Sequence, residues 1–263
     1  MKEDTDIRLA VTDLTKKYIV PQRLFARSGE NKIRTTKALD KVSFTLTPGL
    51  YGILGPNGAG KSTLINLITG TLLPNGGTVK WNDVNIKKLG RKYRRQIGYM
   101  PQQQTLYDSF TGGQFLSYMC ALKEISREDT VREVEEAAEK VNLAGELSKR
   151  LSAYSGGMKQ RLLTAGRILG HPKLMIFDEP TRGLDPKERY RLRSLLKELS
   201  RDSIVITATH VVSDVESVAD EILLLRKGKL VDKAPVDVLI ERYAKGGDLE
   251  QVYLNIFSEE GKA

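Results

Sequence analysis

A glycine-rich segment between an apolar stretch and an amphipathic one constrains the fold of this chain more than any other feature. The segment reads GPNGAGKS at 55 to 62 and follows the apolar, β-branched stretch KVSFTLTPGLYGILG. After it, KSTLINLITG places Leu64, Leu67 and Ile68 at helical spacing, and Gly70 is suited to end a helix. The order strand, loop, helix predicts a phosphate-binding unit, because glycines let backbone amides turn toward phosphate oxygens.

The loop assigns chemistry to individual residues. We expect Lys61 to contact the β and γ phosphates of a nucleotide and the Ser62 hydroxyl to coordinate Mg²⁺, with the positive end of the following helix facing the anion. A chance glycine turn would require neither the preceding strand nor the following helix. The residues predicted to bind the nucleotide here are Asn57, Gly58, Ala59, Gly60, Lys61, Ser62 and Thr63.

Two adjacent carboxylates end another apolar stretch, KLMIFDEP, at Asp178 and Glu179. Phosphoryl transfer needs one acid to hold the metal through water and one to orient or deprotonate the attacking water, and we assign these roles to Asp178 and Glu179 respectively. Taken alone, adjacent acids at a strand end are more often a solvated turn. The phosphate loop upstream favours the catalytic interpretation.

Composition bounds the class of protein. The chain has 263 residues, of which 40% are hydrophobic, enough for one large domain or a domain with an inserted subdomain. No apolar stretch approaches the roughly 20 residues of a transmembrane helix, and the start MKEDTDIRLA lacks the features of a signal peptide. Together with a single cysteine, Cys120, this predicts a chain of the reducing cytosol.

A net charge of +9 leaves the partner open. Nucleic acid, an anionic membrane surface or anionic ligands would each suit it, although charge runs are usually only a solvated face. The basic residues are dense in KKLGRKYRR at 87 to 95 and again at Arg23, Arg27, Lys32, Arg34, Lys37 and Lys41.

The remaining pattern predicts an α/β chain with a helical insertion. IRLAVTDLT is read as a strand, KLMIFDEP and SIVITATH as parallel strands joined by a crossover helix, and EILLLRKGKLVD as two short strands around Lys227 and Gly228. Residues 103–170 are read as helical, with Val131, Val134, Ala138 and Val141 on one apolar face. Residues 19–37 are polar, basic and poorly periodic, and are read as a loop or extension.

At this point a family resemblance becomes clear. The segment YSGGMKQR at 154 to 161, placed shortly before IFDEP, resembles the signature motif of ATP-binding cassette (ABC) proteins. GYMPQ at 98 to 102, GLDP at 183 to 186 and the histidine of TATH fall in the family's order and approximate spacing, so the resemblance extends over nearly the whole chain. Tyr154, Met158 and Arg182 depart from the family's usual leucine, glutamine and serine, but the phosphate-contacting positions remain.

The resemblance implies a fold and a division of the chain. It implies a phosphate-loop NTPase core with a parallel sheet, an antiparallel β subdomain and an inserted helical subdomain that carries the signature. The core would cover about 1–102 and 171–235, the helical subdomain about 103–170, a C-terminal extension about 236–263, and a basic insertion about 19–37.

The resemblance also implies site residues. Ser155, Gly156 and Gly157 would bind the γ-phosphate held by an opposite subunit, although without the family they would be read as a helix cap. For the other residues the resemblance implies that Gln102 touches the metal and the attacking water, His210 bonds the γ-phosphate, Asp185 communicates across the dimer, and Tyr18 stacks on adenine, with Phe25 as a weaker substitute. The plain alternatives are a solvated loop, a structural histidine, a helix N-cap and simple packing.

The activity that the resemblance implies is ATP hydrolysis with Mg²⁺ by a transporter subunit. Its partners would be a second nucleotide-binding subunit, identical or closely related and paired head to tail, and a separate integral membrane permease, at the cytoplasmic face of the cell membrane. The signature variant and the tail DLEQVYLNIF favour export. The alternative is a non-transport member acting on nucleic acid or the ribosome, which a single phosphate loop and the lack of sustained heptads disfavour. An ATP-binding regulator without hydrolysis is disfavoured by Glu179 and His210.

Overall fold

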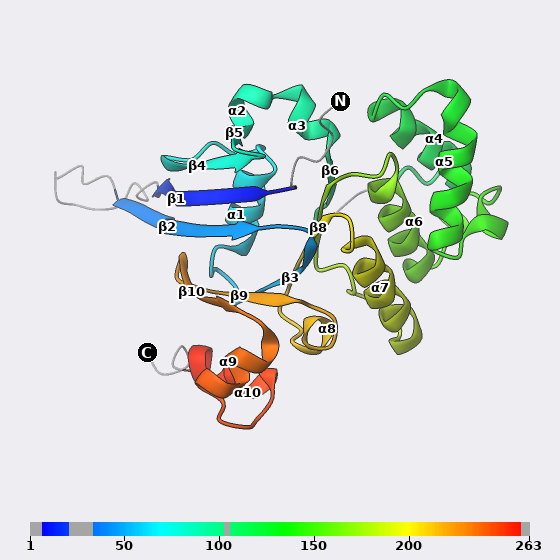
Figure 1. Cartoon of the computed structure of the whole chain (residues 1–263). Helices are drawn as coiled ribbons and strands as arrows, with labels where there is room; N and C mark the ends of the chain where they lie inside the picture. The colour runs from blue at the N-terminus through cyan, green and yellow to red at the C-terminus, as the bar shows by residue number, and fades with distance from the viewer. Residues whose placement is uncertain (1–6, 21–33, 103–105, 259–263) are drawn as a thin grey trace, which may run out of the picture.

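The computed structural model describes residues 7–20, 34–102 and 106–258, and Figure 1 labels its helices and strands. The strands are β1 (Leu9–Val20), β2 (Arg34–Leu46), β3 (Gly49–Leu54), β4 (Gly76–Trp81), β5 (Val84–Asn85), β6 (Ile97–Met100), β7 (Leu174–Asp178), β8 (Ile204–Thr209), β9 (Glu221–Arg226) and β10 (Lys229–Ala234). The α-helices are α1 (Lys61–Ile68), α2 (Ile86–Leu89), α3 (Arg91–Arg95), α4 (Gly112–Leu122), α5 (Arg127–Lys140), α6 (Gly156–Ile168), α7 (Pro186–Leu199), α8 (Ser213–Glu216), α9 (Val236–Tyr243) and α10 (Leu249–Phe257).

The central sheet has the strand order β10-β9-β3-β8-β7-β6. The pairs from β9 to β6 are parallel, and every residue of β3, β7 and β8 is buried, as the continuous apolar runs of the sequence predict. β9 and β10 form an antiparallel hairpin whose turn residues Lys227 and Gly228 both have positive φ, 48° and 76°. The carboxyl ends of β3, β7 and β8 meet at one edge of this sheet, which is where the candidate site lies.

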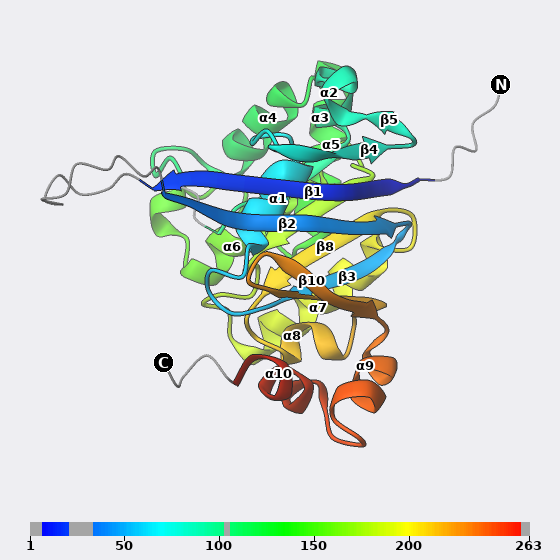
Figure 2. The same cartoon turned by 90° about the vertical axis from the view of Figure 1, so that its left-hand side faces the viewer.

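A second, antiparallel sheet covers α1. Its order is β2-β1-β4-β5, and Figure 2 shows β1 and β2 running side by side across it. Leu64 and Ile68 of α1 belong to a core that also includes Leu9 of β1 and Ile176 of β7, so α1 lies between the two sheets. The predicted combination of a parallel core sheet, an antiparallel β portion and inserted helices is confirmed.

The span 19–37 differs in part from the loop expected for it. β1 continues to Val20 and β2 begins at Arg34, with Ile19 paired to Thr35 and Tyr18 to Thr36. The sequence reading missed these strand ends because their residues, among them Ile19, Thr35 and Thr36, are exposed and show no apolar alternation, whereas the antiparallel pairing extends from the buried part of both strands. The rest of the span, with Phe25, lies outside the described residues.

The helical insertion packs on the opposite face of the central sheet. α4, α5 and α6 share a core with Met175 and Phe177 of β7, and Figure 1 shows these helices on the side away from β1 and β2. Val134, Ala138 and Val141 are buried as predicted, but Val131 is 64% exposed, and Glu133 is buried instead. The buried arc of α5 is thus centred between Val134 and Ala137, which leaves Val131 at its edge.

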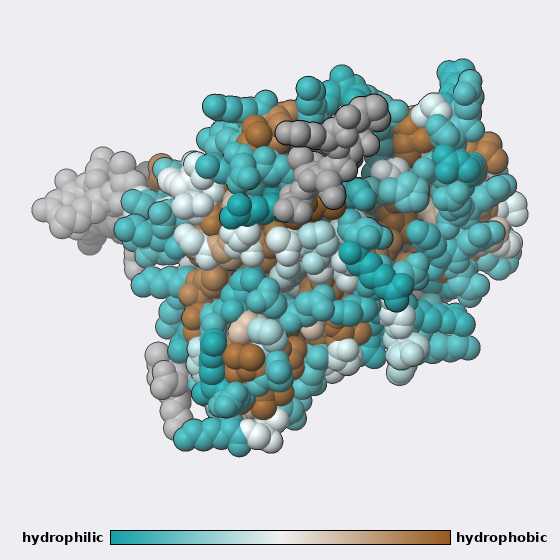
Figure 3. Space-filling model, in the orientation of Figure 1, coloured by the Kyte–Doolittle hydropathy of each residue, from teal (hydrophilic) through white to brown (hydrophobic). Residues whose placement is uncertain are grey.

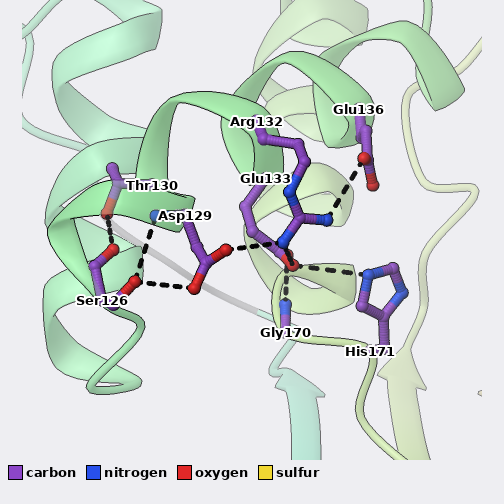
Figure 4. A network of polar contacts seen from close by, with 8 residues as sticks. All are labelled: Ser126, Asp129, Thr130, Arg132, Glu133, Glu136, Gly170 and His171. Carbon is purple, nitrogen blue, oxygen red and sulfur yellow. Dashed lines mark hydrogen bonds and ion pairs between the residues drawn. The ribbon is translucent and has the colours of Figure 1, made fainter.

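Glu133 joins this insertion to the central sheet (Figure 4). Its Oε2 accepts the backbone N–H of Gly170 at 2.8 Å, and its Oε1 lies 3.4 Å from Nε2 of His171, in the turn that leads into β7. Arg132 lies 4.0 Å from the same carboxylate and 2.8 Å from Asp129. A buried acid is therefore used to tie α5 to the segment preceding the Asp178–Glu179 pair.

The chain ends in α9 and α10, which cover the β9 side of the sheet. Leu239, Val252 and Phe257 pack with Leu54 and Ile222 in a separate core. Figures 1 and 2 both place these helices at the end of the molecule opposite α2, α3 and α4. Among the residues described, no helix is both long and apolar enough to cross a membrane.

Candidate nucleotide-binding site

A polar pocket of about 310 Å³ opens at the carboxyl edge of the central sheet. It is bounded by the loop after β3, the first turn of α1 and the end of β7. The residues that line it are Ala38, Pro56, Asn57, Gly58, Gly60, Lys61, Ser62, Thr63, Gln102, Asp178 and Glu179. The structure thus brings together the phosphate loop, both predicted carboxylates and Gln102.

The loop takes its shape from glycines in the left-handed region. Gly58 has a φ of 81° and Gly60 a φ of 109°, conformations that L side chains rarely adopt. A Cβ on Gly60 would lie 2.6 Å from the carbonyl oxygen of Ala38, so this position has no room for a side chain. α1 begins at the next residue, and its first backbone N–H groups therefore face the pocket.

Lys61 provides a positive charge at the pocket floor. Its Nζ donates to the carbonyl oxygens of Gly55 and, at 3.2 Å, of Pro56. Burial lowers its pKa, while the carboxylates of Glu179 and Asp178 oppose that shift. The ammonium group is thus bonded to its own loop and is close enough to both carboxylates to interact with their charge.

Asp178 ends β7 beside the hydroxyl of Ser62. Burial raises the pKa of this carboxyl, and the neighbouring charge of Glu179 raises it further, against the effects of Lys61 and of the hydrogen bond with Ser62. A carboxylate whose ionised form is disfavoured by its surroundings gains from a cation placed next to it.

These residues fit a magnesium ion that arrives with a nucleotide. Ser62 and Asp178 offer a hydroxyl and a carboxylate at one wall of the pocket, and Gln102 adds an amide oxygen. Within the described ranges, no group of three or more His, Cys, Asp or Glu side chains could hold a metal ion unaided. Mg²⁺ typically binds through one or two carboxylates, waters and substrate phosphates, which is the donor set this pocket would provide.

Glu179 is held in an uncommon backbone conformation by the end of β8. Its φ is 54°, and its backbone N–H donates to the carbonyl of Ala208 at 2.8 Å. Oε1 accepts the backbone N–H of His210 at 3.1 Å and lies 2.7 Å from His210 Nδ1, while Oε2 accepts the hydroxyl of Thr209 at 3.2 Å. The carboxylate is buried, yet it lines the pocket, so it is fixed in place and reachable by substrate.

The signature residues lie outside this pocket. Ser155 caps α6 by accepting the N–H of Met158 at 3.2 Å, and Ser155 and Gly156 are exposed. Ahead of them, Tyr154 is buried and its hydroxyl donates to the carbonyl of Glu146 at 2.8 Å. The tyrosine that replaces the usual leucine therefore anchors the start of α6 by packing and a hydrogen bond.

Three further predicted residues, His210, Asp185 and Tyr18, are not among those that line the pocket. His210 contacts Glu179, its side chain is 61% exposed, and it does not line the pocket. Asp185 caps α7 through the N–H of Glu188 at 2.9 Å, the alternative that its sequence also suggested. Tyr18 is 41% exposed, with the ammonium of Lys16 5.5 Å from its ring centroid, and it is not among the residues that line the pocket.

Three contacts around the site were missed in the sequence. Thr209 holds Glu179, Thr181 donates to the buried Asp214, and Nε2 of Gln160 in the signature helix donates to the carbonyl of Pro180 at 2.7 Å. Each joins segments far apart in the chain, so no local pattern marks it. Only the position of Thr209 directly before His210 could have drawn attention to it.

The fold and the pocket define the class: a phosphate-loop nucleoside triphosphatase. Comparison with known proteins specifies the family. Residues 39–182 match the family model described as ABC transporter. A relative from Bacillus subtilis (strain 168), the uncharacterized ABC transporter ATP-binding protein YxlF, is 37% identical over 207 residues, which cover 78% of this chain and 68% of that protein. The chain belongs to the ABC transporter family and carries its ATP-binding ATPase domain.

Solved structures agree in fold. A structure of the ATP binding subunit of an ABC transporter is similar with a TM-score of 0.78 and 26% identity, covering 94% of this chain and 98% of that one. The bacterial ABC transporter cassette MJ0796, in a dimeric structure, has a TM-score of 0.74 at 25% identity, covering 86% of this chain and 98% of that one. ABC transporter A family member 4 of Arabidopsis thaliana is 35% identical over 73% of this chain, which spans only 21% of that protein.

Proposed function

We propose that this chain hydrolyses ATP as the nucleotide-binding subunit of an ABC exporter, closing head to tail with a second copy or a close relative and driving a separate membrane permease at the cytoplasmic face of the membrane. The observation that carries this proposal is the division of the site. The pocket contains the phosphate loop and both carboxylates, whereas Ser155, Gly156 and Gly157 are outside it.

The division supports a dimer because the signature residues are suited to bind a phosphate but lie outside the pocket that contains their own chain's phosphate loop. The start of α6 offers backbone N–H groups, the Ser155 hydroxyl and two glycines around which a Cβ would meet nothing closer than 3.7 Å. In a two-fold pair each contact is made twice. One head-to-tail pairing would therefore complete two equivalent sites, each with a phosphate loop from one chain and a signature from the other.

The chemistry follows from the residues that line the pocket. Lys61 and the loop amides bind the β and γ phosphates, and the Glu179 carboxylate orients the attacking water and accepts its proton. The water oxygen bonds to the γ-phosphorus, the bond to the β–γ bridging oxygen breaks, and ADP leaves with that oxygen. Mg²⁺, held by Ser62, Asp178 and Gln102, would neutralise charge on the phosphate oxygens. His210 keeps the Glu179 carboxylate in place, and its bond to the γ-phosphate is part of the proposal.

Gln102 supports coupling to a permease. It lines the pocket and lies just before the insertion that carries α4, α5 and α6, so a change at the γ-phosphate would reach those helices through a short segment. Export rather than import is favoured by the signature with Tyr154 and Met158 and by the tail DLEQVYLNIF, which forms α10. Adenine stacking by Tyr18 stays part of the proposal.

Light scattering tests the proposal. With ATP and Mg²⁺, Glu179→Gln should double in mass from the 29.4 kDa of one chain, because bound ATP is not removed. Adding Ser155→Arg should abolish the doubling without preventing ATP binding. A mass that stays at one chain in both proteins would contradict the composite site.

The permease is tested by purifying the tagged chain from detergent-solubilised membranes of its native host. A stoichiometric multi-helix membrane protein is expected. Ribosomes or nucleic acid in its place would overturn the transporter assignment in favour of a non-transport role.

A further inference from the structure

A second pocket, of about 340 Å³, lies away from the nucleotide site, between the end of α1, β4 and the short helices α2 and α3. Its volume is at the lower end of the roughly 300–1,000 Å³ typical of small-molecule sites. The apolar side chains that line it are Leu67, Leu72, Leu73, Val79, Ile86 and Tyr93. Leu73 is 61% exposed, which places apolar surface at the mouth as well as inside.

The interior offers few free polar groups. The Tyr93 hydroxyl donates to the carbonyl of Ile68 at 2.8 Å. The Thr69 hydroxyl donates to the carbonyl of Asn66, and the Asn85 side chain accepts the N–H of Lys87. An occupant that needs hydrogen bonds in the interior, such as a peptide backbone, would be disfavoured there, whereas a hydrocarbon chain would not.

The rim is positively charged. Lys87 and Arg94 line the pocket, and Lys88 and Lys92 are exposed on the same two helices. Among the described residues none of these four pairs with a carboxylate, whereas Arg91 and Arg95 on α3 both pair with Glu124. Figure 3 shows hydrophobic atoms between hydrophilic ones at the end of the molecule where Figure 1 draws α2 and β5.

We infer that this pocket binds an anionic lipid, with part of an acyl chain among its apolar side chains and a phosphate headgroup on Lys87 and Arg94. Apolar surface beside unpaired cations matches the two halves of such a molecule. The basic run KKLGRKYRR, which the nucleotide site does not use, then has a partner of matching charge.

The position of the pocket agrees with a lipid partner. α2 and α3 lie at the same end of the molecule as α4 and away from α9 and α10 (Figures 1 and 2). In the proposed transporter the helical insertion meets the permease, so this end would face the bilayer. This step rests on the proposed function, but the chemistry of the pocket does not.

A built-in reporter makes the inference testable. Trp81 is the only tryptophan of the chain, it is 4% exposed, and its ring centroid lies 5.9 Å from that of Tyr93, which lines the pocket. The probe is lysophosphatidylglycerol below its critical micelle concentration, added to the full chain without nucleotide. We expect a saturable change in Trp81 fluorescence. Lysophosphatidylcholine of the same chain length should bind at least about tenfold more weakly, because its headgroup has no net charge.

Variants distinguish binding of the lysolipid at this pocket from nonspecific electrostatic attraction of an anionic lipid to a basic protein. Lys87→Glu/Arg94→Glu should weaken binding by about tenfold or more, and Leu73→Asp should weaken it through the apolar part. The control Lys173→Glu/Arg201→Glu changes the net charge equally, at exposed residues in the turns flanking β7 and α7, and should bind as the wild type does. ATP binding by each variant, measured in the same samples, separates failure of this inference from failure of the proposed function.

Several results would overturn the inference. Equal weakening by both charge-reversed pairs would mean nonspecific attraction. Glycerol phosphate binding as tightly as the lysolipid would mean an anion site without a chain site, and displacement of the lysolipid by a polyglutamate peptide at equal concentration would point to an acidic protein partner instead.

Discussion

Nδ1 of His210 lies 2.7 Å from Oε1 of Glu179, and the backbone N–H of His210 donates to the same oxygen. The histidine is largely exposed while the carboxylate is buried, so the contact joins the solvent side of the site to the carboxylate assigned as its general base. A side chain in this place can orient the acid whether or not it also touches the γ-phosphate.

His210→Ala should therefore lower ATP turnover by about 100-fold, because the general base Glu179 loses the contact that orients it and a positioned base contributes about 100-fold or more. Tight ATP binding should persist, because the phosphate loop is unchanged. Steady-state phosphate release checks the first expectation and nucleotide titration the second. His171→Ala, at the only other histidine, should retain normal turnover. Equal loss in both variants would contradict the role given to His210.

Asp178→Asn should stabilise the resting protein while weakening its response to nucleotide. Because burial raises the folded-state pKa of this carboxyl, its ionised form is disfavoured, and stability falls as pH rises through the unfolded and then the folded pKa. At neutral pH the uncharged amide of the variant removes the free-energy cost of burying an ionised carboxylate. We expect the melting temperature without ligand to rise by on the order of 2 °C, a small effect since part of the carboxylate meets water. The further rise caused by ATP and Mg²⁺ should shrink. A lower melting temperature without ligand would contradict this account.

Lys123 should give the protein a pH-dependent stability in the alkaline range. Its ammonium donates to the carbonyls of Arg167 and Leu169, and burial, aided by the charge of Arg167, lowers its pKa from 10.5 to about 8. The charged ammonium is disfavoured in the folded protein, so below pH 8 the fold bears the full free-energy cost of burying it. Stability therefore rises between pH 8 and 10.5.

The comparison with Lys123→Met isolates this effect. Over that range the free energy of unfolding of the wild type should gain about 3 kcal/mol relative to the variant, as a shift of this size implies. Urea unfolding at a series of pH values measures the difference. Parallel profiles for the two proteins would rule out the role of Lys123.

Glu133→Ala should destabilise the junction of α5 with the turn before β7. The N–H of Gly170 loses its charged acceptor, at a cost of about 1.5–3 kcal/mol, the range for a hydrogen bond to a charged group. Glu135→Ala, on the exposed side of the same helix, is the matched control and should change stability by less than about 0.5 kcal/mol. Chemical unfolding measures both, and similar values for the two variants would refute the buried contact.

The sequence predicted those parts of the site whose chemistry is local. The phosphate loop is one continuous segment, and Asp178 and Glu179 are marked by the strand that precedes them, so both features could be recognised from consecutive residues. Thr209 and Asp214 could not, because their importance comes from contacts with residues 30 and 33 positions away. Val131 was misplaced for a related reason: helical spacing fits several rotations of α5, and the observed one is set by contacts with distant residues, such as that of Glu133 with Gly170.

The measurement that tests the central claim most directly is phosphate release by Glu179→Gln under saturating ATP and Mg²⁺, with nucleotide binding followed in parallel. Glu179 is assigned as the base, so turnover should fall by about 100-fold or more while binding is retained. Near-normal phosphate release from a variant that still binds ATP would show that another group accepts the proton and that the assignment of this site is wrong.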